Sequence, residues 1–271
     1  MNVLTNNRMR ISIITINYNN AIGLEKTIKS VISQDFKDYE YIIIDGGSND
    51  GSVDIIKKYA YKIDFWISEP DKGIYNAMNK GVSHAHGKYL NFMNSGDILY
   101  NNYVLRNIFA RNYSEDIITG TTIGNDDNDI RFSTEDKITF LTLYRSTISH
   151  QASFIKTELL HKYPYNENLK IVSDWEFWIK ALITANCSHT FDNTIIAKID
   201  LTGISITNNV DREAERQEVL CQNIPIRILE DYKPLQYVDS QMIEYVAKIS
   251  KTYRLHKITS FLLRIICKLI K

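Results

Sequence analysis

The sequence is poor in cysteine and contains no long apolar run, and each absence excludes a class of protein. Its cysteines are Cys187, Cys221 and Cys267, an odd number at wide spacing that fits neither a disulfide framework nor a Cys-x-x-Cys zinc site. The apolar run at residues 11–16 is too short for a signal core, and no later run is long enough to span a membrane. We therefore expect a protein of the reducing cytoplasm.

Net charge and a glycine-rich dinucleotide fingerprint are also lacking. The 32 basic residues balance the 32 acidic ones, so no overall field would attract nucleic acid, and we expect no nucleic-acid partner. No Gly-x-Gly-x-x-Gly follows the first apolar run, which argues against a dinucleotide-dependent oxidoreductase. With 271 residues, of which 44% are hydrophobic, the chain can bury a full core, as one large domain or a domain with an appendage.

What is present is a regular alternation of strand and helix patterns. The runs "RISIITI" and "YIII" are typical of buried strands, and apolar residues recur at helical spacing between them. The alternation continues through "IDFWIS" and "KYLNFM", with a further helix pattern at residues 74–82. Strand and helix alternate four times, so we expect an α/β fold in which a mostly parallel central sheet is flanked by helices.

In such open sheets, ligands bind outside the carboxyl ends of the strands, so the loops that follow the strands are the candidate site. These loops read "NYNN", "DGGSNDGS", "EPDKGIYN" and "NSGD"; all are polar, and three of the four contain a carboxylate. After about residue 110 the alternation weakens. There, "IGNDDNDI" predicts an acidic surface turn, and "VSDWEFWIKALI" predicts a helix with Asp174 near its N-terminus.

The tail from residue 247 to residue 271 has a composition of its own. It contains seven basic residues and no acidic one, and its apolar residues share one face of a helix. A basic amphipathic helix is typical of a membrane-surface element, because apolar burial and attraction to anionic lipid add. The alternative is a helix packed on the protein's own core. The basic residues are Lys248, Lys251, Arg254, Lys257, Arg264, Lys268 and Lys271.

Four blocks in order, "ISIITINYNN", "SVISQDFKDYEYIIIDGGSNDGS", "SEPDKGIYNAMNKG" and "LNFMNSGD", resemble the nucleotide-sugar-binding half of family 2 glycosyltransferases, which have the Rossmann-like GT-A fold. A fifth block, "SHQASF" followed by "SDWEFW", resembles the acceptor side of that family. The resemblance implies a glycosyltransferase domain at residues 1–215, with a donor half at about 10–100 and an acceptor half at 101–215. We expect residues 216–271 to form a helical extension that ends in the basic tail.

The resemblance implies that Tyr18 covers the nucleotide base, usually uracil, and that Asp45 hydrogen-bonds to it. From its position alone, Asp45 could instead cap the next turn. Gly46 stands where many members carry a second Asp. Gly73 and Asn76 lie where the family approaches the donor, although Asn76 replaces an expected Asp and would also fit a helix N-terminus.

The block "NSGD" occupies the place of the family's DxD-type metal motif. Asp97 matches the metal-ligating carboxylate, while Ser95 and Gly96 stand beside the donor where other members carry acids. Because Mg²⁺ or Mn²⁺ commonly takes one or two protein carboxylates plus phosphate oxygens, one Asp is enough. Taken alone, Ser-Gly-Asp would equally fit an ordinary turn.

On the acceptor side, Asp174 in "SDWE" matches the family's acidic motif. It is our candidate for the base that removes the proton from the acceptor hydroxyl, with Glu176 in reserve; the alternative for Asp174 is a helix N-cap. His150 in "SHQ" could contact donor phosphate or metal, although a lone His is more often structural.

These roles imply an inverting, metal-dependent glycosyltransferase that moves one sugar from a nucleotide sugar, by the resemblance a UDP-sugar, to a hydroxyl. We expect a glycan or lipid-linked glycan acceptor, as in bacterial capsule, O-antigen or exopolysaccharide synthesis, and peripheral contact of the tail with the cytoplasmic face of the inner membrane. Two alternatives stay open. One is transfer to a protein or a soluble glycan, and the other is a nucleotide-sugar-binding partner without catalysis, which the missing acids would suit.

Overall fold

The computed structural model describes residues 10–124, 130–133, 137–202, 208–236, 238 and 240–269. Most of the expected acidic turn "IGNDDNDI" and the last basic residue of the tail lie outside these ranges. The chain divides into two compact units between Asn223 and Ile224, and each unit is described by itself. The expected extension began at residue 216, within a helix that the structure assigns to the first unit.

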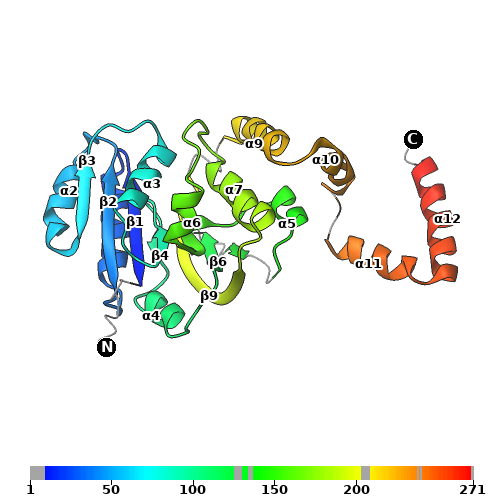
Figure 1. Ribbon diagram of the computed structural model, residues 1–271, viewed down its shortest axis with the longest axis horizontal. Helices are drawn as coiled ribbons and strands as arrows, with labels where there is room; N and C mark the ends of the chain where they lie inside the picture. The colour runs from blue at the N-terminus through cyan, green and yellow to red at the C-terminus, as the bar shows by residue number, and fades with distance from the viewer. Residues whose placement is uncertain are drawn as a thin grey trace, which may run out of the picture. The chain divides into compact units, whose positions relative to one another are not determined.

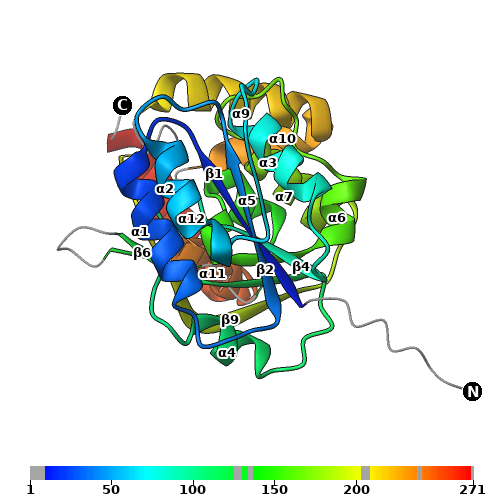
Figure 2. The same ribbon diagram turned by 90° about the vertical axis from the view of Figure 1, so that its left-hand side faces the viewer.

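The first unit opens with four parallel strands and three helices. Strand β1 is buried along its whole length, as expected for a strand with helices on both faces. Helices α1 and α2 lie on one face of these strands and α3 lies on the other (Figures 1 and 2). The elements are β1 (Ile11–Asn17), α1 (Ala21–Ile32), β2 (Tyr39–Asp45), α2 (Ser52–Tyr59), β3 (Phe65–Ser68), α3 (Ile74–Ser83) and β4 (Tyr89–Phe92).

The remaining strands extend the same sheet with mixed polarity. The order is β3-β2-β1-β4-β8-β6-β9-β5, with β7 paired to β6, so the expected α/β sheet is confirmed, with a parallel half and a mixed half. Strand β8 runs antiparallel to both β4 and β6, and β9 runs parallel to β6. These strands are β5 (Ile98–Leu99), β6 (Ile117–Gly124), β7 (Arg131–Ser133), β8 (Ser153–Lys156) and β9 (His189–Ile199).

Helices between and after these strands carry several of the polar residues singled out in the sequence. They are α4 (Val104–Phe109), α5 (Phe140–Arg145), the turn η2 (His150–Ala152), α6 (Thr157–Lys162), α7 (Ser173–Trp178), the π-helix η3 (Ile179–Thr184) and α9 (Asn209–Asn223). Both tryptophans of α7, Trp175 and Trp178, are fully buried, and each donates its ring N–H to a backbone carbonyl. These buried rings anchor helix α7, and with it Asp174, which directly precedes Trp175.

The second unit is helical. It contains α10 (Ile226–Tyr232), the turn η4 (Lys233–Leu235), α11 (Ser240–Ser250) and α12 (Tyr253–Leu269). Helix α12 exposes large apolar side chains such as Phe261 and Leu262, together with its basic residues. Within the described part of the chain, no helix combines the length and apolarity needed to cross a membrane.

Candidate active site

A pocket of about 750 Å³ opens at the carboxyl ends of β1, β2, β3 and β4, where the sheet topology places ligand sites. Six of the residues expected at the site line it: Tyr18, Gly73, Ser95, Asp97, His150 and Asp174. Four others, Asp45, Asn76, Gly96 and Glu176, do not line it. The pocket therefore joins the loops of the first half of the chain to the two blocks of the second half.

Asp45 is completely buried beneath the pocket, at the end of β2. Its two carboxylate oxygens accept four hydrogen bonds, from the side chains of Asn17, Ser48 and Ser68 and from the backbone N–H of Ser48, at 2.6–2.9 Å. Burial raises the pKa of Asp45, but these hydrogen bonds outweigh it and leave the pKa below its usual value. Asp45 thus ties together the ends of β1, β2 and β3, and direct contact with a base stays a prediction.

Asn76 and Glu176 are also engaged elsewhere. The side chain of Asn76 accepts a hydrogen bond from the backbone N–H of Lys72 and donates one to Glu167, so it braces the loop that precedes α3. Glu176 is buried, and its Oε1 lies 2.8 Å from Nζ of Lys180, one turn along the chain. In this arrangement Asp174, rather than Glu176, is the carboxylate of α7 that reaches the pocket.

Asp97 lies in the pocket wall with only 5% of its surface exposed. Its Oδ1 accepts a hydrogen bond of 2.8 Å from the backbone N–H of Asp200, and its Oδ2 accepts one of 2.9 Å from Nε2 of Gln151. Burial raises the pKa of Asp97, and these two hydrogen bonds offset the rise only in part. Each oxygen keeps a second lone pair that could bind a cation.

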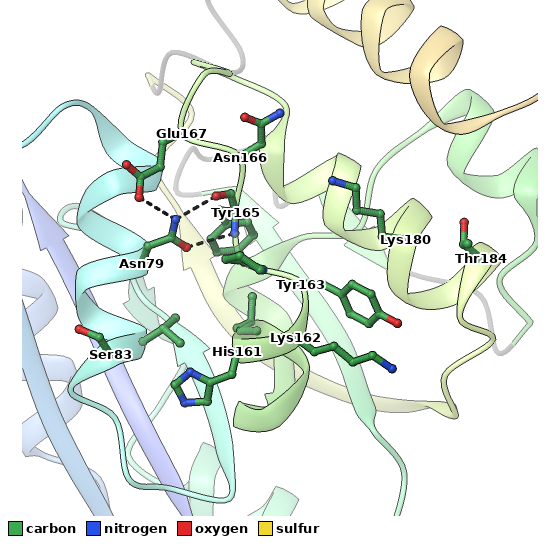
Figure 3. Close-up of a pocket in the computed structure, with 13 residues that line it drawn as sticks. Asn79, Ser83, His161, Lys162, Tyr163, Tyr165, Asn166, Glu167, Lys180 and Thr184 are labelled. Carbon is green, nitrogen blue, oxygen red and sulfur yellow. Dashed lines mark hydrogen bonds between the residues drawn. The ribbon is translucent and has the colours of Figure 1, made fainter.

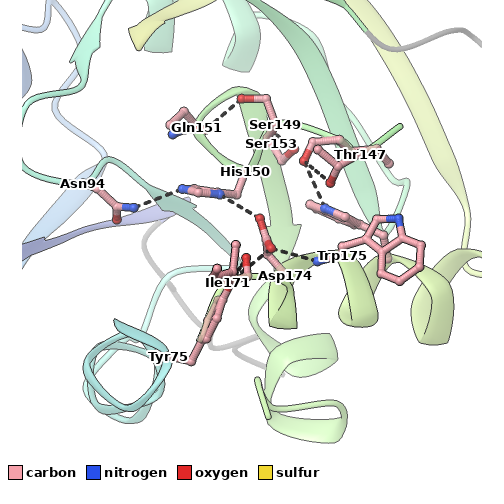
Figure 4. Close-up of polar contacts among 12 residues, drawn as sticks. Tyr75, Asn94, Thr147, Ser149, His150, Gln151, Ser153, Ile171, Asp174 and Trp175 are labelled. Carbon is pink, nitrogen blue, oxygen red and sulfur yellow. Dashed lines mark hydrogen bonds and ion pairs between the residues drawn. The ribbon is translucent and has the colours of Figure 1, made fainter. Parts of the chain in front are cut away.

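Asp174 is held on both of its oxygens. Its Oδ2 lies 3.1 Å from Nδ1 of His150, and its Oδ1 lies 3.1 Å from the hydroxyl of Tyr75 (Figure 4). On its other side, Nε2 of His150 lies 3.1 Å from Nδ2 of Asn94. A carboxylate only accepts hydrogen bonds, so Nδ1 of His150 donates its proton to Asp174. His150 therefore orients the carboxylate of Asp174.

Burial of the phenol, reinforced by the charge of Asp174, raises the pKa of Tyr75 well above its ordinary value. Its hydroxyl lies 2.6 Å from the carbonyl oxygen of Ile171 and has a single proton to share between that oxygen and Asp174. Tyr75 stays protonated and holds the segment that leads into α7 against α3.

The turn η2 contacts two of the carboxylates of the pocket. His150 contacts Asp174 and the next residue, Gln151, contacts Asp97, so adjacent side chains of one turn reach acids that are far apart in the chain. Gln151 is itself oriented, since its Oε1 accepts a hydrogen bond from the hydroxyl of Ser149. The motif "SHQ" thus positions both acids, whereas the sequence had suggested only that His150 contacts donor phosphate or metal.

Two further carboxylates of the pocket, Asp71 and Asp200, were missed in the sequence. A Cβ added to Gly46 would lie 2.8 Å from Oδ2 of Asp71, and one added to Gly96 would lie 3.1 Å from Oδ2 of Asp200. Each of these glycines stands where other family members were expected to carry an acid. Asp71 and Asp200 therefore bring carboxylates to the two places where the local sequence lacks them.

The pocket is acidic and rich in oxygen ligands. Its described lining residues include Asp71, Asp97, Asp174 and Asp200 but only one cationic side chain, Lys170. No group of three or more His, Cys, Asp or Glu side chains in the described ranges is arranged to hold a metal ion. Asp97 and Asp200 nevertheless offer the hard oxygen ligands that Mg²⁺ and Mn²⁺ prefer, and both cations commonly take their remaining ligands from water and phosphate.

A second pocket, of about 860 Å³, lies beside α3, α6 and η3 and shares no described lining residue with the first (Figure 3). In its wall, the amide of Asn79 bonds to the backbone of Tyr165 and to Glu167. The hydrogen bond from Asn79 is the largest cause that keeps the pKa of Glu167 below its usual value. This network braces the segment that precedes α7, outside the pocket that holds the four aspartates.

The chain matches a known protein family over more than half of its length. The family model described as Glycosyl transferase family 2 matches residues 12–167. An uncharacterized glycosyltransferase of Mycobacterium tuberculosis is 30% identical over 201 residues, which cover 72% of this chain and 76% of that protein. A PGL/p-HBAD biosynthesis glycosyltransferase of Mycobacterium bovis is 28% identical over 225 residues, which cover 80% of this chain and 87% of that protein.

Solved glycosyltransferases share the fold at low sequence identity. A structure of S. aureus TarS residues 1–349 in complex with UDP-GlcNAc has a TM-score of 0.66 and 19% identity, over 79% of this chain and 66% of that one. The match spans only 43% of a longer TarS chain. The mannosyltransferase PcManGT of Pyrobaculum calidifontis, in complex with GDP-Man and Mn²⁺, has a TM-score of 0.58 and 13% identity, over 95% and 80% of the two chains. The family match, the fold and the pocket agree: the chain is a glycosyltransferase with the GT-A fold and belongs to glycosyl transferase family 2.

Proposed function

We propose that the chain transfers one sugar from a UDP-sugar to an acceptor hydroxyl by a single inverting displacement. The observation that carries the proposal is the pairing of two differently held carboxylates in one pocket. Asp97 is buried and bonded by Gln151, whereas Asp174 is bonded by His150 and Tyr75. Carboxylates in unlike environments are suited to unlike roles.

Asp174 is the proposed base. The hydrogen bond from Nδ1 of His150 stabilises the negative charge of Asp174 and fixes its direction toward the pocket. As the acceptor oxygen bonds to the anomeric carbon, its proton passes to Asp174. The bond from that carbon to the diphosphate oxygen breaks, and its electron pair leaves with the nucleoside diphosphate. Attack on the face opposite the leaving group inverts the anomeric configuration.

Asp97 and Asp200 would hold a divalent cation, Mg²⁺ or Mn²⁺. Two observations support the fit. The Oδ2 of Asp200 lies beside Gly96, the residue before Asp97, and both acids offer only oxygen ligands. When bound, the cation supplies positive charge to the departing diphosphate. The balance of charge in the pocket supports this need, because four aspartates against Lys170 would otherwise repel a diphosphate. The complex of PcManGT with Mn²⁺ supports it from a shared fold.

Tyr18, Gly73 and Ser95 line the part of the pocket proposed for the donor. The ring of Tyr18 is 68% exposed at the end of β1, so it could stack on a base. The complex of TarS with UDP-GlcNAc supports a UDP-sugar as donor.

The acceptor we propose is a lipid-linked glycan at the cytoplasmic face of a bacterial membrane. Support comes from the second unit, where α12 exposes an apolar face next to Arg254, Lys257, Arg264 and Lys268. Apolar burial and attraction to anionic lipid would act together on such a helix.

The test is a panel of UDP-, GDP-, dTDP- and CMP-sugars with Mn²⁺ and bacterial membrane lipid extract, in which release of the nucleotide and transfer of labelled sugar are both measured. We expect one UDP-sugar to be consumed with labelled lipid formed. Asp97→Ala and Asp174→Ala should each remove most of the transfer. Unchanged transfer in both variants would refute the proposed roles, and donor binding without any transfer or hydrolysis would favour a non-catalytic binding partner.

A further inference from the structure

The end of the pocket proposed for the nucleotide base contains a carboxylate that the family resemblance did not single out. Asp71 lies in the loop between β3 and α3 and lines the pocket with Tyr18, Gly46 and Gly47. Its Oδ1 accepts a hydrogen bond of 3.1 Å from the backbone N–H of Gly73, which fixes the direction of the carboxylate. Its Oδ2 lies against Gly46, 2.8 Å from the place that a Cβ of that residue would occupy.

Tyr18 and Asp71 converge on the same spot. A Cβ on Gly46 would lie 3.2 Å from the ring of Tyr18 and 2.8 Å from Oδ2 of Asp71, so both side chains pack closely against this glycine. Gly47 has a φ of 77°, and a Cβ there would lie 3.2 Å from the backbone N of Pro70. The two loops therefore pack closely, and a glycine pair is needed for Asp71 to stand beside Tyr18.

Asp45, by contrast, has no surface exposed and no oxygen without a hydrogen-bond donor from the protein. To receive a further donor from a base, it would have to give up bonds that join three strands. At this end of the pocket, Asp71 is the carboxylate that a ligand can reach without that cost.

We propose that Asp71 selects the nucleobase by accepting a hydrogen bond from its ring imide N–H while Tyr18 stacks on the base. This inference rests on the proposed function and extends it to base specificity. Uracil carries such a donor at N3, whereas N3 of cytosine is an acceptor that a carboxylate repels. A carboxylate in this place therefore discriminates between two bases of similar size and shape.

The test compares UDP with CDP by calorimetric titration of full-length protein in Mn²⁺. We expect the wild type to bind UDP about tenfold to 100-fold more tightly than CDP, as for a hydrogen bond to a charged group. Asp71→Asn should weaken the binding of UDP and strengthen the binding of CDP. The amide can turn its NH₂ group toward N3 of cytosine while its oxygen still accepts the hydrogen bond from the backbone N–H of Gly73. Sugar transfer is not needed for this readout.

Glu69→Gln is the matched control, since Glu69 lies in the same loop, pairs with Lys80 and does not line the pocket. It should leave the ratio of UDP to CDP affinity unchanged. If Asp71→Asn weakens both nucleotides equally, or leaves the ratio as in the wild type, the inference is wrong while UDP binding still stands. If the wild type binds neither nucleotide, the proposed function fails and the inference falls with it.

Discussion

At the scale of single residues, the contact between His150 and Asp174 gives the most specific prediction about catalysis. We predict that Asp174→Asn lowers kcat about 10²- to 10⁴-fold with little change in donor affinity, because an amide cannot take the proton from the acceptor. His150→Ala should lower kcat as well, since it removes the group that orients Asp174. Transfer rates and donor binding of both variants check this.

A double-mutant cycle separates positioning from an independent role of His150. If His150 acts through Asp174, His150→Ala should cost little in the Asp174→Asn background, because the two side chains are then one coupled unit. An equal loss of kcat in both backgrounds would show that His150 has a separate function, such as contact with donor phosphate.

The buried acid Asp97 predicts an unusual dependence of stability on pH. Its native-state pKa lies above the ordinary value of 3.8, so the native state binds the proton more readily than the unfolded chain. The contribution of Asp97 to the free energy of unfolding is therefore greatest below pH 3.8 and falls as pH rises through the raised native pKa. The Asp97→Asn variant lacks this contribution, because an amide does not titrate in this pH range.

Urea unfolding of wild type and Asp97→Asn in metal-free buffer from pH 3.5 to 7 isolates this contribution. We expect the free energy of unfolding of the wild type, relative to the variant, to decline with rising pH. Carboxyl groups with a lowered pKa, such as Asp45, change the free energy of unfolding in the opposite direction. Their contributions are the same in both proteins and cancel in the difference. A difference that is flat or rises with pH would contradict the burial argument.

Only some of the residues that line the pocket could be predicted from the sequence. Tyr18, Asp97 and Asp174 could be placed because each lies in a short motif that resembles a family motif, next to or within a recognisable strand or helix. Asp71 and Asp200 could not be placed as partners of Gly46 and Gly96. That pairing depends on how loops from distant parts of the chain pack, which no local pattern records.

At the scale of elements, α9 is fastened to the segment that carries the proposed base. The carboxylate of Glu215 in α9 accepts hydrogen bonds of 2.7–3.2 Å from the backbone N–H groups of Lys170, Ile171 and Val172. The next residue, Arg216, lies over the ring of Trp175 with its guanidinium carbon 4.0 Å from the ring centroid. Helix α9 thus holds the backbone that leads into α7 and Asp174.

We predict that Glu215→Ala destabilises the protein by about 1–3 kcal/mol, because backbone donors lose a charged acceptor. It should also lower kcat more than donor affinity, and speed hydrogen exchange of residues 170–174. Glu218→Ala on the exposed side of α9 is the control, and its exchange should match the wild type. Exchange and kcat equal to the wild type in Glu215→Ala would show that α9 does not position the base.

The elements themselves were predictable where the pattern was local. The first three strands and helices follow from apolar runs and helical spacing, and the structure has them at nearly those residues. The long strand β9 could not be predicted in this way, and neither could the antiparallel direction of β8 or its place in the sheet. Strand β8 is only four residues long, and its place between β4 and β6 is set by pairing with distant strands.

At the scale of the whole molecule, the basic helix α12 predicts binding to anionic membranes. We expect full-length protein to sediment with vesicles containing phosphatidylglycerol and not with neutral vesicles. Each basic residue near such a surface contributes about 1 kcal/mol, so neutralising four of them should abolish sedimentation. The substitutions to Gln are at Arg254, Lys257, Arg264 and Lys268.

The matched control neutralises four exposed lysines of the first unit and so changes the net charge by the same amount. It should sediment with anionic vesicles like the wild type. The absence of wild-type binding would favour a protein or soluble-glycan acceptor, and equal loss in both variants would show that α12 has no special role. The control substitutions to Gln are at Lys26, Lys37, Lys57 and Lys62.

The measurement that tests the central claim most directly is a calorimetric titration of UDP into wild-type protein and Asp97→Ala, each with Mn²⁺ and with chelator. The account predicts saturable binding to the wild type that requires Mn²⁺ and is strongly weakened by Asp97→Ala, because in the proposed site Asp97 would hold the cation that the diphosphate needs. UDP binding that is the same with chelator and in Asp97→Ala would contradict the proposed metal site. No binding of UDP under any of these conditions would contradict the proposed donor.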